Sequence, residues 1–190
     1  PQMADSAAVV KTLGSDFPAG KLLAIVANLR GAEEALQHAQ IAYLGFPLSV
    51  SETFQMRNTR KSIAEALEVV EQIKTAADEA GKKLVVYLSM AFGNPYEEAY
   101  SVEQVIALGK RLQALGVYRI ALSDTIGSAT TSLIEQVYCQ AAQALEVPEL
   151  ALHLHSLPDQ VATKTAESLR SGCRYLDTAL LGFGGCPMAK

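Results

Sequence analysis

The sequence predicts an α/β fold built around a parallel sheet, and three observations lead to this fold class. Six short apolar runs alternate along the chain with segments that have amphipathic helical spacing. The apolar runs contain few polar positions, which is typical of strands that are covered on both faces. The helical segments between them are long enough to serve as the crossovers that join parallel strands.

The six predicted strands come from these apolar runs. Their near-continuous apolarity, with many leucine, isoleucine and valine residues, favours buried strands over loops. The predicted strands cover residues 22–27, 41–46, 84–90, 118–123, 150–155 and 175–181.

The predicted helices are recognised by their three- and four-residue spacing and by their end signals. Ile63, Leu67, Val70 and Ile73 lie on one helical face, and Gly81 follows as a helix-ending glycine. Other helices have a possible capping box at their start or a proline in the first turn. The predicted helices cover residues 3–13, 31–38, 62–80, 101–115, 131–145 and 158–171.

Two architectures fit this order of elements. One is an open doubly wound sheet, and the other is a (β/α)8 barrel that lacks some of its units. A complete barrel takes about 250 residues, whereas this chain has 190. No G-x-G-x-x-G follows the first strand, which weakens the dinucleotide-binding reading. No linker divides the chain, so we expect one domain over residues 1–190.

Composition excludes several classes of function. The net charge is −4 and no long basic run occurs, so we expect no nucleic-acid partner. No apolar run approaches the ~20 residues of a membrane span, so we expect no membrane partner. The three cysteines, Cys139, Cys173 and Cys186, are widely spaced, which indicates free thiols in a reducing compartment. We therefore expect a cytoplasmic protein, although the chain begins without methionine and residues are expected beyond both ends.

Two of the three histidines stand two residues apart at the end of the fifth predicted strand. Residues i and i+2 of a strand point to the same side, so His153 and His155 project together. Sites in parallel α/β folds are built at this end of the strands. The pair can therefore be two ligands of one divalent metal ion, or two histidines held by backbone or carboxylate groups in a polar pocket.

Two other residues could take part in chemistry. Asp124 follows the fourth strand, where a carboxylate can bind substrate, ligate a metal or transfer a proton, but it equally suits a cap or turn. Cys186 lies on a glycine-rich loop, where a thiol near a cation could act as acid or base. The alternative is an incidental cysteine in a flexible turn.

Two loops complete the candidate site. Residues 89–96, which begin with Ser89, follow the third strand and read as a turn. Residues 51–60 are polar and contain Arg57 and Arg60, which could meet phosphate groups of a ligand. From the sequence alone, a solvated surface loop is the better interpretation of that segment.

Taken together, these segments resemble the 3-hydroxy-3-methylglutaryl-CoA lyases, which belong to a superfamily of metal-dependent TIM-barrel lyases. The matches run in family order along almost the whole chain, and the Gly-Gly-Cys-Pro loop best separates the lyases from related synthases. The matching segments are residues 1–5, 27–31, 51–54 with Asn58, 93–97, 123–127, 153–155 and 182–187.

The resemblance implies a (β/α)8 TIM barrel, here partial, with about six βα units that correspond to strands 3 to 8. It also implies a carbon–carbon lyase that cleaves 3-hydroxy-3-methylglutaryl-CoA to acetyl-CoA and acetoacetate. The implied cofactor is Mg²⁺ or Mn²⁺, the implied partner is an acyl-CoA substrate, and a homodimer is expected.

The resemblance also implies residue roles. His153 and His155 would be metal ligands, Asp124 would contact substrate near the reacting hydroxyl, and Cys186 would transfer a proton. The substrate-binding residues would be Asn58, Ser89 and Thr125.

This chain departs from the family pattern at several places. The Asp-Gly-Leu-Arg/Gln-type motif of the family's first strand is absent from these residues. Ser156 stands where many members have Asp, and Ala121 stands where many have a substrate-binding serine. The alternatives are a related superfamily lyase or acyl-CoA-condensing synthase with another acyl substrate, or a non-catalytic barrel remnant.

Overall fold

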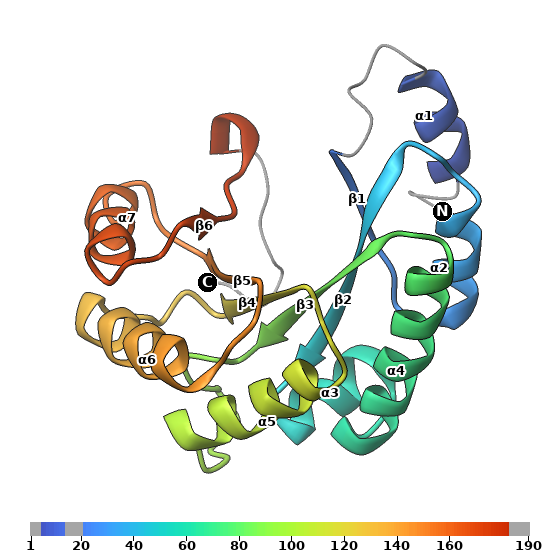
Figure 1. Ribbon diagram of the computed structural model, residues 1–190. Coiled ribbons are helices and arrows are strands. Elements are labelled where there is room, and N and C mark those ends of the chain that lie inside the picture. The colour runs from blue at the N-terminus through green and yellow to red at the C-terminus, as the bar shows by residue number, and fades with distance from the viewer. Residues whose placement is uncertain (1–4, 14–20, 183–190) are drawn as a thin grey trace.

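The computed structural model of the chain describes residues 5–13 and 21–182. Strands and helices alternate along this part of the chain (Figure 1). In chain order they are α1 (Ser6–Leu13), β1 (Leu22–Ile25), α2 (Leu29–Leu36), β2 (Ile41–Ser49), α3 (Glu52–Thr59), α4 (Ile63–Glu79), β3 (Lys83–Ser89), α5 (Val102–Ala114), β4 (Arg119–Asp124), α6 (Thr131–Ala144), β5 (Glu149–Leu154), α7 (Val161–Arg170), β6 (Tyr175–Leu176) and a short 3₁₀ helix, η1 (Leu180–Gly182).

The six strands form one sheet in the order β1-β2-β3-β4-β5-β6, and every neighbouring pair is parallel. A doubly wound sheet would reverse its strand order at one point, and no reversal occurs here. The sheet curves, with its helices along the convex side, and forms half of a barrel (Figure 1). The predicted partial (β/α)8 TIM barrel is therefore confirmed.

Side chains alternate between the two faces of this curved sheet. The helix-facing residues are the core of the protein, and they pack against helices such as α4. In the central strands this buried set has even residue numbers: Leu44, Phe46 and Leu48; Leu84, Val86 and Leu88; Ile120 and Leu122; Leu152. The odd-numbered residues of the same strands therefore face the barrel interior.

Helices α4 and α5 carry the end signals that their sequences predict. The Ser101 side chain accepts a hydrogen bond from the Gln104 backbone N–H, and the Gln104 side chain accepts one from the Ser101 N–H, which confirms the capping box. Gly81 and Gly116 follow α4 and α5 with positive φ angles of 65° and 73°. This backbone conformation suits glycine and stops each helix before the next strand.

Three sequence predictions about elements are wrong. Pro158 was expected in the first turn of a helix, but α7 begins at Val161 and Pro158 precedes it. Residues 51–60 were expected to be a surface loop, but they form α3, whose first turn is capped by the Ser51 hydroxyl. The last strand is only Tyr175–Leu176 rather than 175–181, because it pairs with β5 through two residues before the chain turns into η1. Short polar helices and short edge strands carry little hydrophobic periodicity, so sequence patterns miss them.

Among the residues that the structure describes, no helix is both long enough and apolar enough to cross a membrane.

Candidate functional site

A cleft of about 750 Å³ opens on the inner face of the half-barrel, toward the carboxyl ends of the strands. This is the end at which parallel barrels build their active sites. Five of the predicted site residues line it: Asn58, Ser89, Thr125, His153 and His155. The fold thus brings together residues from α3, β3, β5 and the segment after β4.

The two histidines meet inside this cleft. His153 pairs with Ser123 of the neighbouring strand, and both side chains face the interior, as does His155 two residues later. The ring centroids of His153 and His155 lie 5.2 Å apart with an interplanar angle of 68°. The prediction that both imidazoles project to the same side is confirmed.

Both rings use their Nδ1 atoms for contacts within the protein. His153 Nδ1 lies 2.9 Å from a carboxylate oxygen of Asp177, and His155 Nδ1 lies 3.0 Å from the backbone oxygen of Thr125. Both partners only accept hydrogen bonds, since an ionised carboxylate and a carbonyl have no proton to give. In the neutral rings, each Nδ1 therefore carries the proton and each Nε2 keeps its lone pair.

This arrangement fits two ligands of one divalent ion. With a metal–nitrogen bond of about 2.1 Å, each ring centroid would lie about 3.2 Å from the ion, so bond angles of roughly 90–110° would separate the centroids by about 4.5–5.2 Å. The observed 5.2 Å lies in that range. Among the described residues no group of three His, Cys, Asp or Glu side chains could hold a metal. The two histidines alone would therefore be an incomplete set of donors for such an ion.

Asp124 does not face the cleft. Its even-numbered position turns the side chain toward the helices, where it is buried, with the residue 1% exposed. The carboxylate accepts hydrogen bonds from the Ala129 backbone N–H, 3.2 Å away, and from the Lys164 ammonium, also 3.2 Å away. Substrate contact by Asp124 stays a prediction, and this placement disfavours it; the alternative role in capping the following loop agrees better with these contacts.

Both the side chain and the backbone carbonyl of Thr125 make hydrogen bonds at the site. Its hydroxyl accepts a hydrogen bond from the Met90 N–H at 2.9 Å, and its carbonyl holds the His155 ring. Ser89 lies on the cleft wall and is 8% exposed, whereas Asn58 on α3 is exposed. Of the three predicted substrate-binding residues, Ser89 and Asn58 have the freer side chains.

Helix α3, which carries Asn58, is held by the loop after β3. The Glu98 carboxylate accepts hydrogen bonds from the hydroxyls of Ser51 and Thr53 and, at 2.8 Å, from the Thr53 backbone N–H. Burial acts to raise the pKa of Glu98, but these hydrogen bonds outweigh it and lower that pKa. Arg57 stacks over the Tyr96 ring at 4.9 Å, so this loop fixes both ends of α3.

The family of the chain follows from its match to known proteins. Residues 1–187 match the family described as HMGL-like.

The chain belongs to the HMGL-like family.

Named relatives of this HMGL-like chain agree with that assignment. It is 33% identical to the mitochondrial hydroxymethylglutaryl-CoA lyase of Mus musculus over 192 aligned residues, which cover 100% of the chain and 58% of the relative. The hydroxymethylglutaryl-CoA lyase structure from Pseudomonas aeruginosa superposes with a TM-score of 0.88 at 32% identity, covering 99% of this chain and 62% of that one.

An HMG-CoA lyase from Acinetobacter baumannii, solved with coenzyme A and 3-methylmalate, superposes with a TM-score of 0.86 at 26% identity. That match covers 100% of this chain and 61% of the other. The HMGL-like chain therefore spans about three fifths of the length of the proteins it resembles.

Cys186, the predicted proton-transfer residue, lies outside the described residues. The other two cysteines are free; Cys173 is buried and Cys139 is partly buried. Burial raises the pKa of Cys173, which keeps it a neutral thiol. Both observations agree with the prediction that these two cysteines are free thiols.

Tyr87 and Asp177 also line the cleft, and neither was among the predicted site residues. The Tyr87 ring meets the His153 ring edge-on at 5.4 Å. Two signals in the sequence could have identified Tyr87 and Asp177. Tyr87 lies two residues before Ser89 and so shares its face of strand β3, and Asp177 directly follows strand β6.

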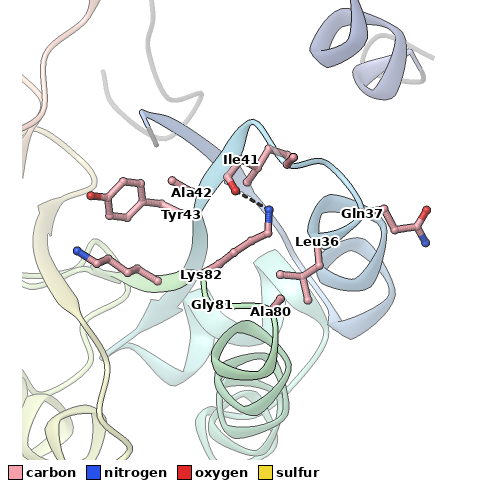
Figure 2. A pocket seen from close by; sticks show the side chains of 10 residues that line it. Leu36, Gln37, Ile41, Ala42, Tyr43, Ala80, Gly81 and Lys82 are labelled. Atoms are coloured by element: carbon pink, nitrogen blue, oxygen red, sulfur yellow. Dashed lines mark hydrogen bonds between the residues drawn. The ribbon is translucent and has the colours of Figure 1, made fainter. Parts of the chain in front are cut away.

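A second concavity, of about 600 Å³, lies at the opposite end of the HMGL-like sheet. Figure 2 shows Lys82 there, reaching the backbone oxygen of Ile41. Its ammonium also donates to the His38 carbonyl, each bond being 2.6 Å long, and burial lowers its pKa. Because this lysine ties the α2–β2 connection to β3, the concavity is a structural feature rather than a candidate active site.

Proposed function

We propose that the protein containing this chain is a metal-dependent carbon–carbon lyase that cleaves 3-hydroxy-3-methylglutaryl-CoA to acetyl-CoA and acetoacetate. One observation supports this proposal most strongly. The Nδ1 atoms of His153 and His155 contact protein acceptors, which leaves both Nε2 lone pairs for a metal ion. Both rings lie at the carboxyl end of the half-barrel of an HMGL-like chain. The names of the relatives and the coenzyme A bound by one of them support the acyl-CoA substrate class.

The proposed reaction breaks one carbon–carbon bond. A general base takes the proton of the tertiary hydroxyl, the bond to the acetyl-CoA carbon breaks as the carbonyl of acetoacetate forms, and the electron pair remains on that carbon as an enolate. A proton then reaches this carbon to give acetyl-CoA. A bound Mg²⁺ or Mn²⁺ would lower the pKa of the hydroxyl and orient the substrate.

The chain's own residues have defined parts in this proposal. His153 and His155 hold the cation through Nε2, while Ser89 and Asn58 on the cleft wall contact the substrate. Cys186 Sγ supplies the proton to the enolate carbon, as the resemblance implies. Dimerisation and a cytoplasmic location stay predictions.

The test is acetoacetate release by the full-length protein from 3-hydroxy-3-methylglutaryl-CoA with Mg²⁺ or Mn²⁺. His153→Ala and His155→Ala should each lower the rate by at least about 100-fold, because a lost ligand removes several kcal/mol of metal-derived stabilisation. His38→Gln is the matched control, since this histidine lies at the other end of the sheet. No acetoacetate from the wild type with either metal, or full activity in both alanine variants, would refute the proposal.

A further inference from the structure

The Asp177 carboxylate is held beside the His153 ring by two separate features. The Asp177 backbone N–H donates to the Leu152 carbonyl at 3.1 Å, which fixes the residue where β6 ends against β5. Its side chain then lies 2.9 Å from His153 Nδ1. The two side chains are 27% and 36% exposed, so the contact is partly shielded from water.

Tyr87 braces the same pair from β3. Its ring packs edge-on against His153 with an interplanar angle of 81°. Burial first, and then the Asp177 carboxylate, raise the pKa of Tyr87 to about 12, so its hydroxyl stays protonated and can donate to Asp177. The imidazole thus contacts Tyr87, Asp177 and His155.

The consequence lies in which nitrogen carries the proton. A neutral imidazole free in water prefers the proton on Nε2, and a metal ligand at Nε2 needs it on Nδ1. Asp177 accepts a hydrogen bond only from a protonated Nδ1, and so it favours the second form. His155 reaches the same form through the Thr125 carbonyl, without a charged partner.

We propose that Asp177 is a positioning residue that fixes the Nδ1-protonated form and the orientation of His153, so that Nε2 is presented to a divalent cation. This inference rests on the proposed function only for the identity of the cation. In metal sites of known proteins, removal of such a carboxylate partner lowers metal affinity or activity by about 10–100-fold.

The first experiment needs no metal. ¹⁵N NMR of the histidine rings in the full-length protein, at a pH where they are neutral, reports which nitrogen is protonated; the His153 signals are assigned by their loss in His153→Gln. In the wild type we expect the proton on Nδ1. In Asp177→Ala we expect a substantial population with the proton on Nε2, whereas His155 is unchanged.

The second experiment measures Mn²⁺ binding by electron paramagnetic resonance. Asp177→Ala should raise the Kd by about 10–100-fold. Asp177→Asn, which keeps an acceptor oxygen of the same size, should have a smaller effect and guards against a folding defect in the alanine variant. Asp159→Ala removes an exposed carboxylate near the same end of the sheet and should leave both readouts unchanged.

The outcomes separate the two proposals. A wild type that binds no Mn²⁺ contradicts the proposed function, while the NMR experiment still decides the role of Asp177. A His153 ring that keeps its proton on Nδ1 in folded Asp177→Ala overturns this inference, even if the enzyme binds Mn²⁺ and cleaves its substrate.

Discussion

The Lys164 ammonium lies 3.2 Å from the Asp124 carboxylate behind the cleft, and both side chains are almost completely buried. Lys164, on α7, also donates to the backbone oxygens of His155, at 3.0 Å, and Gly127, at 3.4 Å. One cation therefore ties together the ends of β4 and β5, from which the Thr125 carbonyl and the His155 ring enter the site.

Lys164→Met should destabilise the fold by about 3–5 kcal/mol, because it leaves the Asp124 carboxylate buried without its cation. Asp124→Asn combined with Lys164→Met should recover part of that loss, since no buried charge then remains. Urea unfolding measures both. Arg30→Ala, which breaks an exposed pair with Glu34, should cost no more than about 0.5 kcal/mol. If Lys164→Met and Arg30→Ala lowered the unfolding free energy equally, burial of the Asp124–Lys164 pair would not be important for stability.

Side chains of β1 and β3 occupy the space beside Gly45 on β2. A Cβ on Gly45 would lie 2.6 Å from Ile25 Cδ1, 2.9 Å from Leu23 Cδ2 and 3.0 Å from Tyr87 Cε2. Gly45→Val should therefore destabilise the protein by about 1–3 kcal/mol through overpacking. Thermal unfolding measures this effect.

Gly31→Ala is the matched control for Gly45→Val. Gly31 lies within α2, and its added Cβ would meet nothing closer than 3.5 Å. Because alanine favours a helix over glycine, this change should stabilise the protein by about 0.5–1 kcal/mol. Opposite signs for the two substitutions support the packing described; the same sign for both would count against it.

Alkaline pH should weaken the fold partly through Tyr87. Its pKa is raised to about 12 in the folded protein, whereas an unfolded tyrosine titrates near about 10. The stabilisation is therefore complete below about pH 10 and is lost as the pH rises toward about 12, because the unfolded chain ionises first. Tyr87→Phe should flatten the fall of the unfolding free energy over this range. An unchanged alkaline profile would be the opposing result.

Acidic pH should loosen helix α3 through Glu98. Because its folded pKa is lowered, the stabilisation is present above the ordinary value of 4.5 and is lost as the pH falls through the folded pKa. Glu98→Gln should reduce the dependence of stability on pH between about 6 and about 3. Hydrogen exchange at the Thr53 amide should become faster in this variant. Glu97→Gln, the same change one residue earlier, should alter neither measurement.

The succession of strands and helices along the chain was predictable because each element leaves a local pattern in the sequence. Apolar runs and capped helices such as the one after Ser101 reveal elements within a few turns of chain. The common direction of His153 and His155 followed from the strand period alone. Helix α3 was missed because its stability comes from Ser51 and from Glu98, which lies 45 residues beyond Thr53.

The sequence by itself determined the six parallel strands, the helical crossovers and the projection of two imidazoles to one side. Only the tertiary structure decided that Asp124 faces the helices and that Asp177, 24 residues after His153, is the carboxylate beside the cleft. Strands buried on both faces lack the polar–apolar alternation that would tell their two sides apart. Contacts between strands depend on the register of the whole sheet, which no local pattern encodes.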